Sequence, residues 1–97
     1  MNRKEGHQSL KQALNEFIES NKLQKGMDQI RVSEVWKASM GPGVSKYTTS
    51  VQLKGDTLYI SLSSSVLREE LSLGRTKIID LLNEALGKEL IQRLILR

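Results

Sequence analysis

The chain has 97 residues, with 15 lysines and arginines against 11 aspartates and glutamates, so its formal net charge is +4. This length predicts a single domain, and the basic balance favours an acidic partner such as nucleic acid without establishing one. The absence of cysteine excludes disulfide scaffolds, thiolate zinc sites and cysteine nucleophiles. Because the N-terminus is polar and the apolar runs are short, we expect a cytoplasmic protein with no signal peptide and no membrane span.

The first predicted element is an amphipathic helix over residues 9–22. Its apolar residues recur at the spacing of one helix face, and they are Leu10, Ala13, Leu14, Phe17 and Ile18. Ser9 and Gln12 have the spacing of a capping box, which predicts a helix start at Ser9. The polar residues 1–8 are expected to form a flexible tail, so that the domain itself spans residues 9–97.

The second predicted helix covers residues 28–40, after a polar turn at residues 21–26. Asp28 can cap its first turn. The Gly-Pro pair at 41–42 is expected to end the helix, because proline disfavours a helical residue before it and glycine supplies the cap. Residues of this helix that are expected to face the core are Ile30, Val35, Trp36 and Met40. The single tryptophan is interpreted as a core anchor, with a base-stacking platform as its alternative role.

The hydrophobic period then changes from 3.6 to 2, which predicts two strands. Apolar and polar residues alternate on both sides of a Lys-Gly-Asp turn at 54–56, and the apolar ones are Val51, Leu53, Leu58, Ile60 and Leu62. This pattern predicts a β-hairpin over residues 51–62, in which Gly55 is free to adopt a positive φ.

A helical region is expected from the serines at 63–65 to about Leu86. Because glycine costs about 1 kcal/mol relative to alanine inside a helix, two helices that meet near Gly74 are favoured over one long helix. Gly87 is expected to end the region, and the apolar segment 89–97 predicts a third strand. The predicted order is therefore α-α-β-β-α(-α)-β, an α+β single domain with a three-stranded sheet and helices on one face.

No group of residues in the sequence has the composition of a catalytic or metal site. His7 is the only histidine, and it lies in the polar tail without a partner for acid–base work or metal ligation. The serines at 63–65 have no activating base and no nucleophile-elbow pattern, so they are expected to cap a helix. The sequence therefore predicts a protein that is not an enzyme and that has no cofactor and no metal.

Basic residues are spread along the chain, and a few of them predict a binding site. Arg68, Arg75 and Lys77 flank the expected helix break, and Lys46 follows the Gly-Pro-Gly turn. If the break faces solvent, its free amides and these charges would contact phosphates or an acidic protein surface. The alternative is that they are ordinary solvated side chains.

Short motifs follow one another along the chain in a distinctive order: Trp36, Gly41-Pro42, Tyr47-Thr48-Thr49, the hairpin, Ser64 to Leu71, Ile78-Ile79, Leu82-Asn83 and Gly87. In this order and spacing the sequence resembles the DciA-like family of small bacterial proteins, and most closely its short members from the Bacteroidetes group. The resemblance covers roughly residues 9–97.

The resemblance implies a fold like the type-II K-homology domain and a role in loading the replicative helicase onto DNA. The implied partners are the replicative helicase and DNA, the DNA bound weakly and without sequence specificity. Two departures accompany it. The segment Leu73–Thr76 has one glycine where an RNA-binding K-homology domain has a Gly-X-X-Gly loop. Longer members carry a basic tail beyond the domain, and because this sequence stops at Arg97, DNA affinity that rests on such a tail is expected to be weaker or absent.

The rival hypothesis is a protein-interaction or self-assembly domain that makes no direct contact with nucleic acid. It would use the edge strand expected at residues 89–97 or the apolar faces of the helices.

Overall fold

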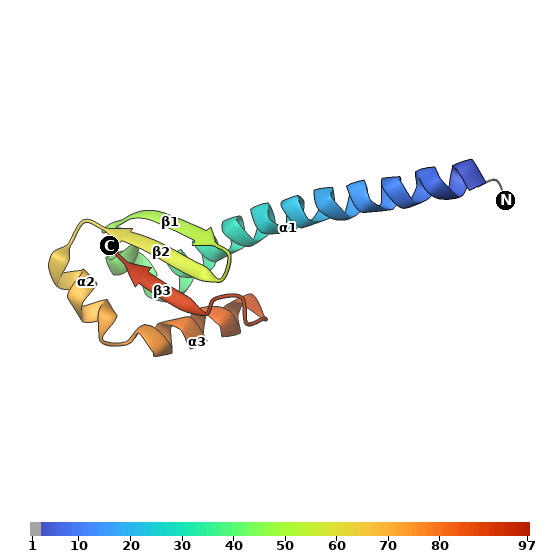
Figure 1. The fold of residues 1–97 in the computed structure, drawn as a ribbon. Helices are drawn as coiled ribbons and strands as arrows, with labels where there is room; N and C mark the ends of the chain where they lie inside the picture. The colour runs from blue at the N-terminus through green and yellow to red at the C-terminus, as the bar shows by residue number, and fades with distance from the viewer. Residues whose placement is uncertain (1–2) are drawn as a thin grey trace.

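The computed structural model describes the backbone of residues 3–97 and the side chains of residues 9–97. It contains one long helix, a β-hairpin, two shorter helices and a third strand, so the predicted α+β single-domain class is confirmed (Figure 1). The elements are α1 Arg3–Ser45, β1 Thr48–Lys54, β2 Thr57–Leu62, α2 Ser65–Ser72, α3 Arg75–Leu86 and β3 Arg93–Leu96.

Helix α1 runs without interruption through the segment predicted as a turn, so the prediction of separate helices at 9–22 and 28–40 is wrong. The segment 21–26 is rich in lysine, leucine and glutamine, which are good helix formers. Its one glycine makes the helix less favourable by only about 1 kcal/mol relative to alanine. Ser9 lies inside α1 and does not cap its start. The helix begins at Arg3, within the residues predicted as a tail, and Met1 and Asn2 lie outside the described residues.

The inward face of α1 also differs from the prediction. Asp28 is a buried residue in the middle of the helix and does not cap it. Ile30 is exposed, whereas Val32 and Trp36 are fully buried. These two residues are four positions apart, and therefore lie one turn apart on the same side of the helix. Trp36 is confirmed as a core residue.

Gly41 kinks α1 close to its end. Its φ of 80° and ψ of 177° are not helical, so the chain changes direction before a last turn that ends at Ser45. Only glycine adopts this φ without a steric cost. Pro42 then starts the new turn, and the carbonyl of Pro42 accepts a hydrogen bond from the Lys46 amide at 3.0 Å. The predicted break at the Gly-Pro pair is thus confirmed as a kink.

The sheet has the order β1-β2-β3, with β1 antiparallel to β2 and β2 parallel to β3. The hairpin is confirmed, and Gly55 in its turn has a φ of 62°. The third strand is also confirmed, although it is shorter than the segment 89–97. Parallel neighbours need a crossover connection, and α2 and α3 provide it between β2 and β3.

The two helices of the crossover begin and end as the sequence predicts. The Ser64 hydroxyl accepts a hydrogen bond from the Leu67 amide at 3.2 Å and so caps α2. The break near Gly74 is confirmed, and Gly87 ends α3 with a left-handed φ of 77°.

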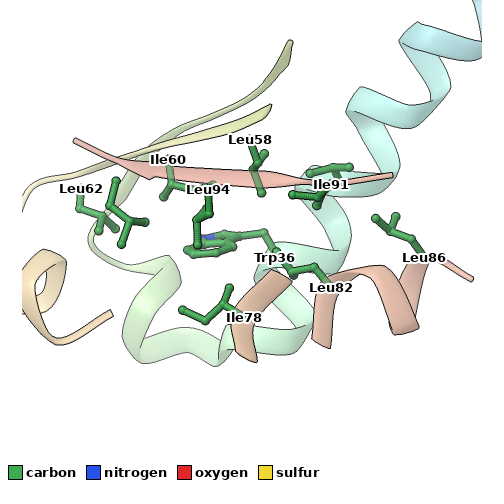
Figure 2. Packing of buried hydrophobic residues seen from close by; sticks show 11 residues of the cluster. Trp36, Leu58, Ile60, Leu62, Ile78, Leu82, Leu86, Ile91 and Leu94 are labelled. Atoms are coloured by element: carbon green, nitrogen blue, oxygen red, sulfur yellow. The ribbon is translucent and has the colours of Figure 1, made fainter. Parts of the chain in front are cut away.

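The core lies between one face of the sheet and the helices α1 and α3. Figure 2 shows the indole of Trp36 between the strands and α3, and its Nε1 donates to the hydroxyl of Thr48 at 3.0 Å. The buried side chains are Val32, Trp36, Leu58, Ile60, Leu62, Ile78, Leu82, Leu86, Ile91, Leu94 and Leu96. Since alternate residues of β2 and β3 are buried, the other face of the sheet is left uncovered by any described helix.

The molecule is elongated because α1 extends beyond the domain (Figure 1). Its principal extents are 65 × 22 × 19 Å, and its radius of gyration of 18.5 Å exceeds the roughly 13 Å of a compact chain of this length. Every side chain from Ser9 to Ser20 is exposed. These residues are called the projecting segment below.

Candidate functional site

The turn between α2 and α3 is the region where the sequence predicts a binding site. The amides of Leu73 and Gly74 donate to carbonyls of the last turn of α2, at 3.3 and 3.1 Å. Gly74 is also the N-cap residue of α3, and no side chain caps that helix. The first turn of α3 therefore presents its positive end to solvent, which favours an anion there.

Arg68 and Arg75 line one hollow beside this turn, together with Glu69 and Leu96. The Nη2 of Arg68 donates to the carbonyl of Leu62 at 3.1 Å, while its Nε is buried without a protein partner. Part of this guanidinium is therefore committed to holding α2 against the end of β2. Arg75 is exposed and has no such structural bond among the described contacts.

Arg75 and Lys77 line a second hollow on the other side of the turn. Glu70 also lines it, and Leu73 there is one of the most exposed apolar side chains of the domain. Each hollow thus combines cations with a carboxylate. The turn can hold an anion, but its field is mixed.

Lys46 lies apart from the other three predicted residues. It lines neither hollow, and its Nζ is 5.9 Å from the centre of the Tyr47 ring. The carbonyl of Tyr47 accepts hydrogen bonds from the amide and hydroxyl of Ser63, just before α2. Lys46 therefore stands at the same end of the sheet as α2 without joining the cluster at the turn.

The projecting segment of α1 carries apolar side chains that nothing in the described structure covers. Leu10, Leu14, Phe17 and Ile18 are between 50 and 64% exposed and recur on one side of the helix. They are called the apolar stripe below. The periodicity of residues 9–22 predicts the helix and its apolar face, but nothing in that pattern tells a face that packs on its own domain from one that does not.

An ion pair between the exposed Lys88 and the largely buried Asp28 fixes α1 to the domain near the projecting segment. The Nζ of Lys88 lies 2.8 Å from Oδ1 of Asp28, and the amide of Gln24 donates to the same oxygen at 3.0 Å. The hydrogen bond from Lys88 lowers the pKa of the Asp28 carboxyl against the opposing effect of burial. Arg31 adds a second tie, because its Nη2 donates to the carbonyl of Leu86 at 3.0 Å.

Sequence reasoning also passed over a group of cations on the uncovered face of the sheet. Lys54, Arg93 and Arg97 are exposed, and Tyr59 lies between two of them. The signal was available in the alternation of the strands, since residues that alternate with buried ones must face the other way.

In the described part of the chain no metal centre forms, and Ser64 and Trp36 have structural roles. Among the side chains of residues 9–97, no three histidine, cysteine, aspartate or glutamate residues lie close enough together to hold a metal ion. Ser64 is used as a helix cap, and Trp36 is too deeply buried to stack on a base. None of the helices in this part of the chain has an apolar stretch that would cross a membrane.

Comparison with known proteins places the chain in a family. A search of curated proteins finds no match. The family model described as "Dna[CI] antecedent, DciA" matches residues 9–96, which is nearly the whole chain. Members of this family are non-catalytic helicase operators in the initiation of DNA replication, and the family implies an interaction with the replicative helicase. Because this family model covers residues 9–96, the chain belongs to the DciA family.

Proposed function

We propose that this chain is an adaptor that contacts the replicative helicase through helix α1 and DNA through the basic residues of the domain. Membership of the DciA family supports the helicase as a partner. The division of labour between the two parts of the molecule is an inference from its geometry.

The observation that carries the proposal is the apolar stripe. A monomeric domain rarely leaves a continuous row of large apolar side chains in water, because each of them gains free energy when it is buried. An amphipathic helix that binds a groove uses residues at this spacing as anchors. The stripe of the projecting segment therefore fits a groove on a protein partner, which we assign to the helicase.

The DNA contact is assigned to Arg75 and Lys77, with Arg68 and Lys46 as outer members. The exposed amides at the start of α3 and these side chains would bind backbone phosphates without reading the bases, so the affinity would be modest. We further propose that the domain has a fold of the type-II K-homology kind. The order α-β-β-α-α-β and the turn at Gly74 support this assignment.

Helicase binding is tested with the purified chain and the purified replicative helicase of the same host, by isothermal titration calorimetry. Phe17→Glu places a charge in the apolar stripe and should weaken binding at least tenfold, with the circular dichroism melt unchanged. Gln12→Glu adds the same charge on the other side of the helix and is the matched control. Equal affinity of Phe17→Glu and wild type would remove α1 from the helicase contact.

The DNA contact is tested by titrating labelled DNA across a salt series. The pair Arg75→Glu and Lys77→Glu should lower affinity and flatten the dependence of log affinity on log salt. The pair Lys22→Glu and Lys25→Glu makes the same charge change on α1 and is the control. If both pairs behave alike, the turn is not a specific part of the DNA contact.

A second candidate function is a purely protein-binding or self-assembling domain. The observation in its favour is the mixed field at the turn, where Glu69 and Glu70 stand beside the cations. Strand β3 pairs only with β2 and leaves an edge on which another strand could add. This function predicts a complex with the helicase that is insensitive to salt, together with no binding to DNA at low salt.

A further inference from the structure

The open face of the sheet forms a surface that is separate from the turn between α2 and α3. In the register of the sheet, Gln52, Tyr59 and Ile95 lie side by side in one row across the strands. Lys54 and Arg93 flank a threonine in the neighbouring row. All of these side chains alternate with the buried ones and so project away from the core.

The strands of this face carry basic side chains, and one carboxylate lies beside them, that of Asp56 in the hairpin turn, whose Oδ1 accepts a hydrogen bond from the Thr57 hydroxyl at 3.3 Å. Lys54, Arg93 and Arg97 are all exposed, and none of the segments Thr48–Lys54, Thr57–Leu62 and Arg93–Leu96 contains an aspartate or a glutamate. Lys54, Arg93 and Arg97 outnumber this carboxylate, so the face has a net positive charge. An acidic partner would meet a net positive field here.

An aromatic ring stands in the middle of these charges. The Nζ of Lys54 is 5.6 Å from the centre of the Tyr59 ring, and the guanidinium carbon of Arg97 is 4.8 Å from it. The amide oxygen of Gln52 accepts from Nη2 of Arg97 at 3.5 Å, which helps to hold the guanidinium beside the ring. Ile95 in the same row is 41% exposed and widens the apolar part of the platform.

We propose that this open face binds single-stranded nucleic acid, with bases stacked on Tyr59 and on the Arg97 guanidinium and with phosphates on Lys54 and Arg93. Aromatic rings and guanidinium planes on a flat sheet suit unpaired bases, whose faces are hidden in a duplex, and cations beside them suit the backbone. An acidic peptide would satisfy the charges but would leave the ring and Ile95 without a planar partner. The inference rests on the proposed function only for the presence of nucleic acid near the protein.

The test uses the full chain and a fluorescently labelled oligothymidylate of about 20 nucleotides, with anisotropy measured across a salt series. Tyr59→Ala should weaken binding roughly fivefold or more, and Tyr59→Phe, which keeps the ring, should bind like wild type. Arg93→Gln should reduce the slope of log affinity against log salt by about 0.7, the value for one phosphate contact on a single strand. Lys22→Gln makes the same charge change on α1 and should leave the affinity and slope close to those of wild type.

A second readout does not depend on affinity. An oligonucleotide that carries 5-iododeoxyuridine is photocrosslinked to the protein, and the modified peptide is identified by mass spectrometry. The expected crosslink is in the peptide that contains Tyr59. Thermal melts of each variant show that its fold is retained, which is expected because these side chains lie outside the core.

Other outcomes overturn the proposal and separate it from the proposed function. Crosslinks at the turn between α2 and α3, with Tyr59→Ala binding like wild type, would remove the open face and leave the DNA contact elsewhere. Helicase binding without any binding to the oligonucleotide at low salt would overturn the open face while the helicase contact stands. Equal affinity for heparin and for the oligonucleotide, insensitive to Tyr59→Ala, would reduce the face to a general polyanion surface. Binding to neither partner would overturn both proposals.

Discussion

Before its kink at Gly41, helix α1 is continuous, and its two ends have different surroundings. Residues 28–40 bury Val32 and Trp36 against the sheet, whereas the projecting segment leaves its apolar stripe in water. Both ends have the amphipathic period of a helix that packs on something. The difference teaches that periodicity identifies a face that needs a partner without saying whether that partner belongs to the same chain.

The largest expected effect separates two aromatic residues of this helix. Trp36→Ala removes a fully buried side chain and should destabilise the domain by about 3–5 kcal/mol, a large part of the stability of a domain of this size. Phe17→Ala lies in the apolar stripe and should change the free energy of unfolding by less than about 0.5 kcal/mol. Urea unfolding followed by circular dichroism measures both, and similar losses for the two variants would contradict the contrast.

A smaller effect is expected at the loop between α3 and β3. The side chain of Asn83 accepts from the amide of Ile91 at 2.9 Å and donates to its carbonyl at 2.8 Å. Asn83→Ala would leave these backbone groups of a buried residue unpaired and should cost about 1–3 kcal/mol. Chemical denaturation checks the value, and Asn15→Ala on the projecting segment is the control with no expected loss.

The ion pair at the junction of the two ends should make stability depend on pH. Lys88 lowers the pKa of Asp28 in the folded protein. The pair therefore contributes its full stabilisation at pH values above the ordinary pKa of an aspartate. That contribution, about 1 kcal/mol, is lost as the pH falls below about 4 towards the lowered pKa. Melts of wild type and Asp28→Asn should therefore converge as the pH falls from 6 to 3. A constant difference between them over this range would show that the pair does not titrate in this way.

The smallest expected effect is a gain in stability from a substitution at Gly26, where the two ends of α1 meet. Gly26 is helical, its φ is not positive, and nothing lies within 4 Å of an added Cβ. Gly26→Ala should therefore raise helix content and stabilise the protein by about 0.5–1 kcal/mol. A loss of stability, measured by the same melts, would show that this segment is not helical in solution.

Local signals in the sequence were sufficient for most of the domain. The hairpin, the Ser64 cap, the break near Gly74 and the stop at Gly87 depend on alternation and on backbone conformations that few residues adopt. Polar composition at 21–26 was misleading, because a segment of good helix formers between two helical segments continues the helix at little cost.

Contacts between residues that are far apart in the chain could not be predicted from such local signals. Asp28 is a frequent helix-capping residue type, but here it meets Lys88, 60 positions away in the sequence. At the predicted binding site the sequence brought together Arg68, Arg75 and Lys77, which do gather around one turn, while Lys46 stands apart.

The rigidity of α1 gives the molecule a fixed angular relation between its surfaces. An α-helix advances 1.5 Å and turns 100° with each residue, so the 12 residues of the projecting segment carry its side chains over roughly 18 Å without freedom to rotate. A helicase bound to the apolar stripe would therefore hold the domain, and any DNA bound to the domain, at one fixed rotation about the axis of α1. Inserting two residues after Ser20 would turn the stripe by about 200° relative to the sheet, whereas a seven-residue insertion would nearly restore its direction at a longer reach.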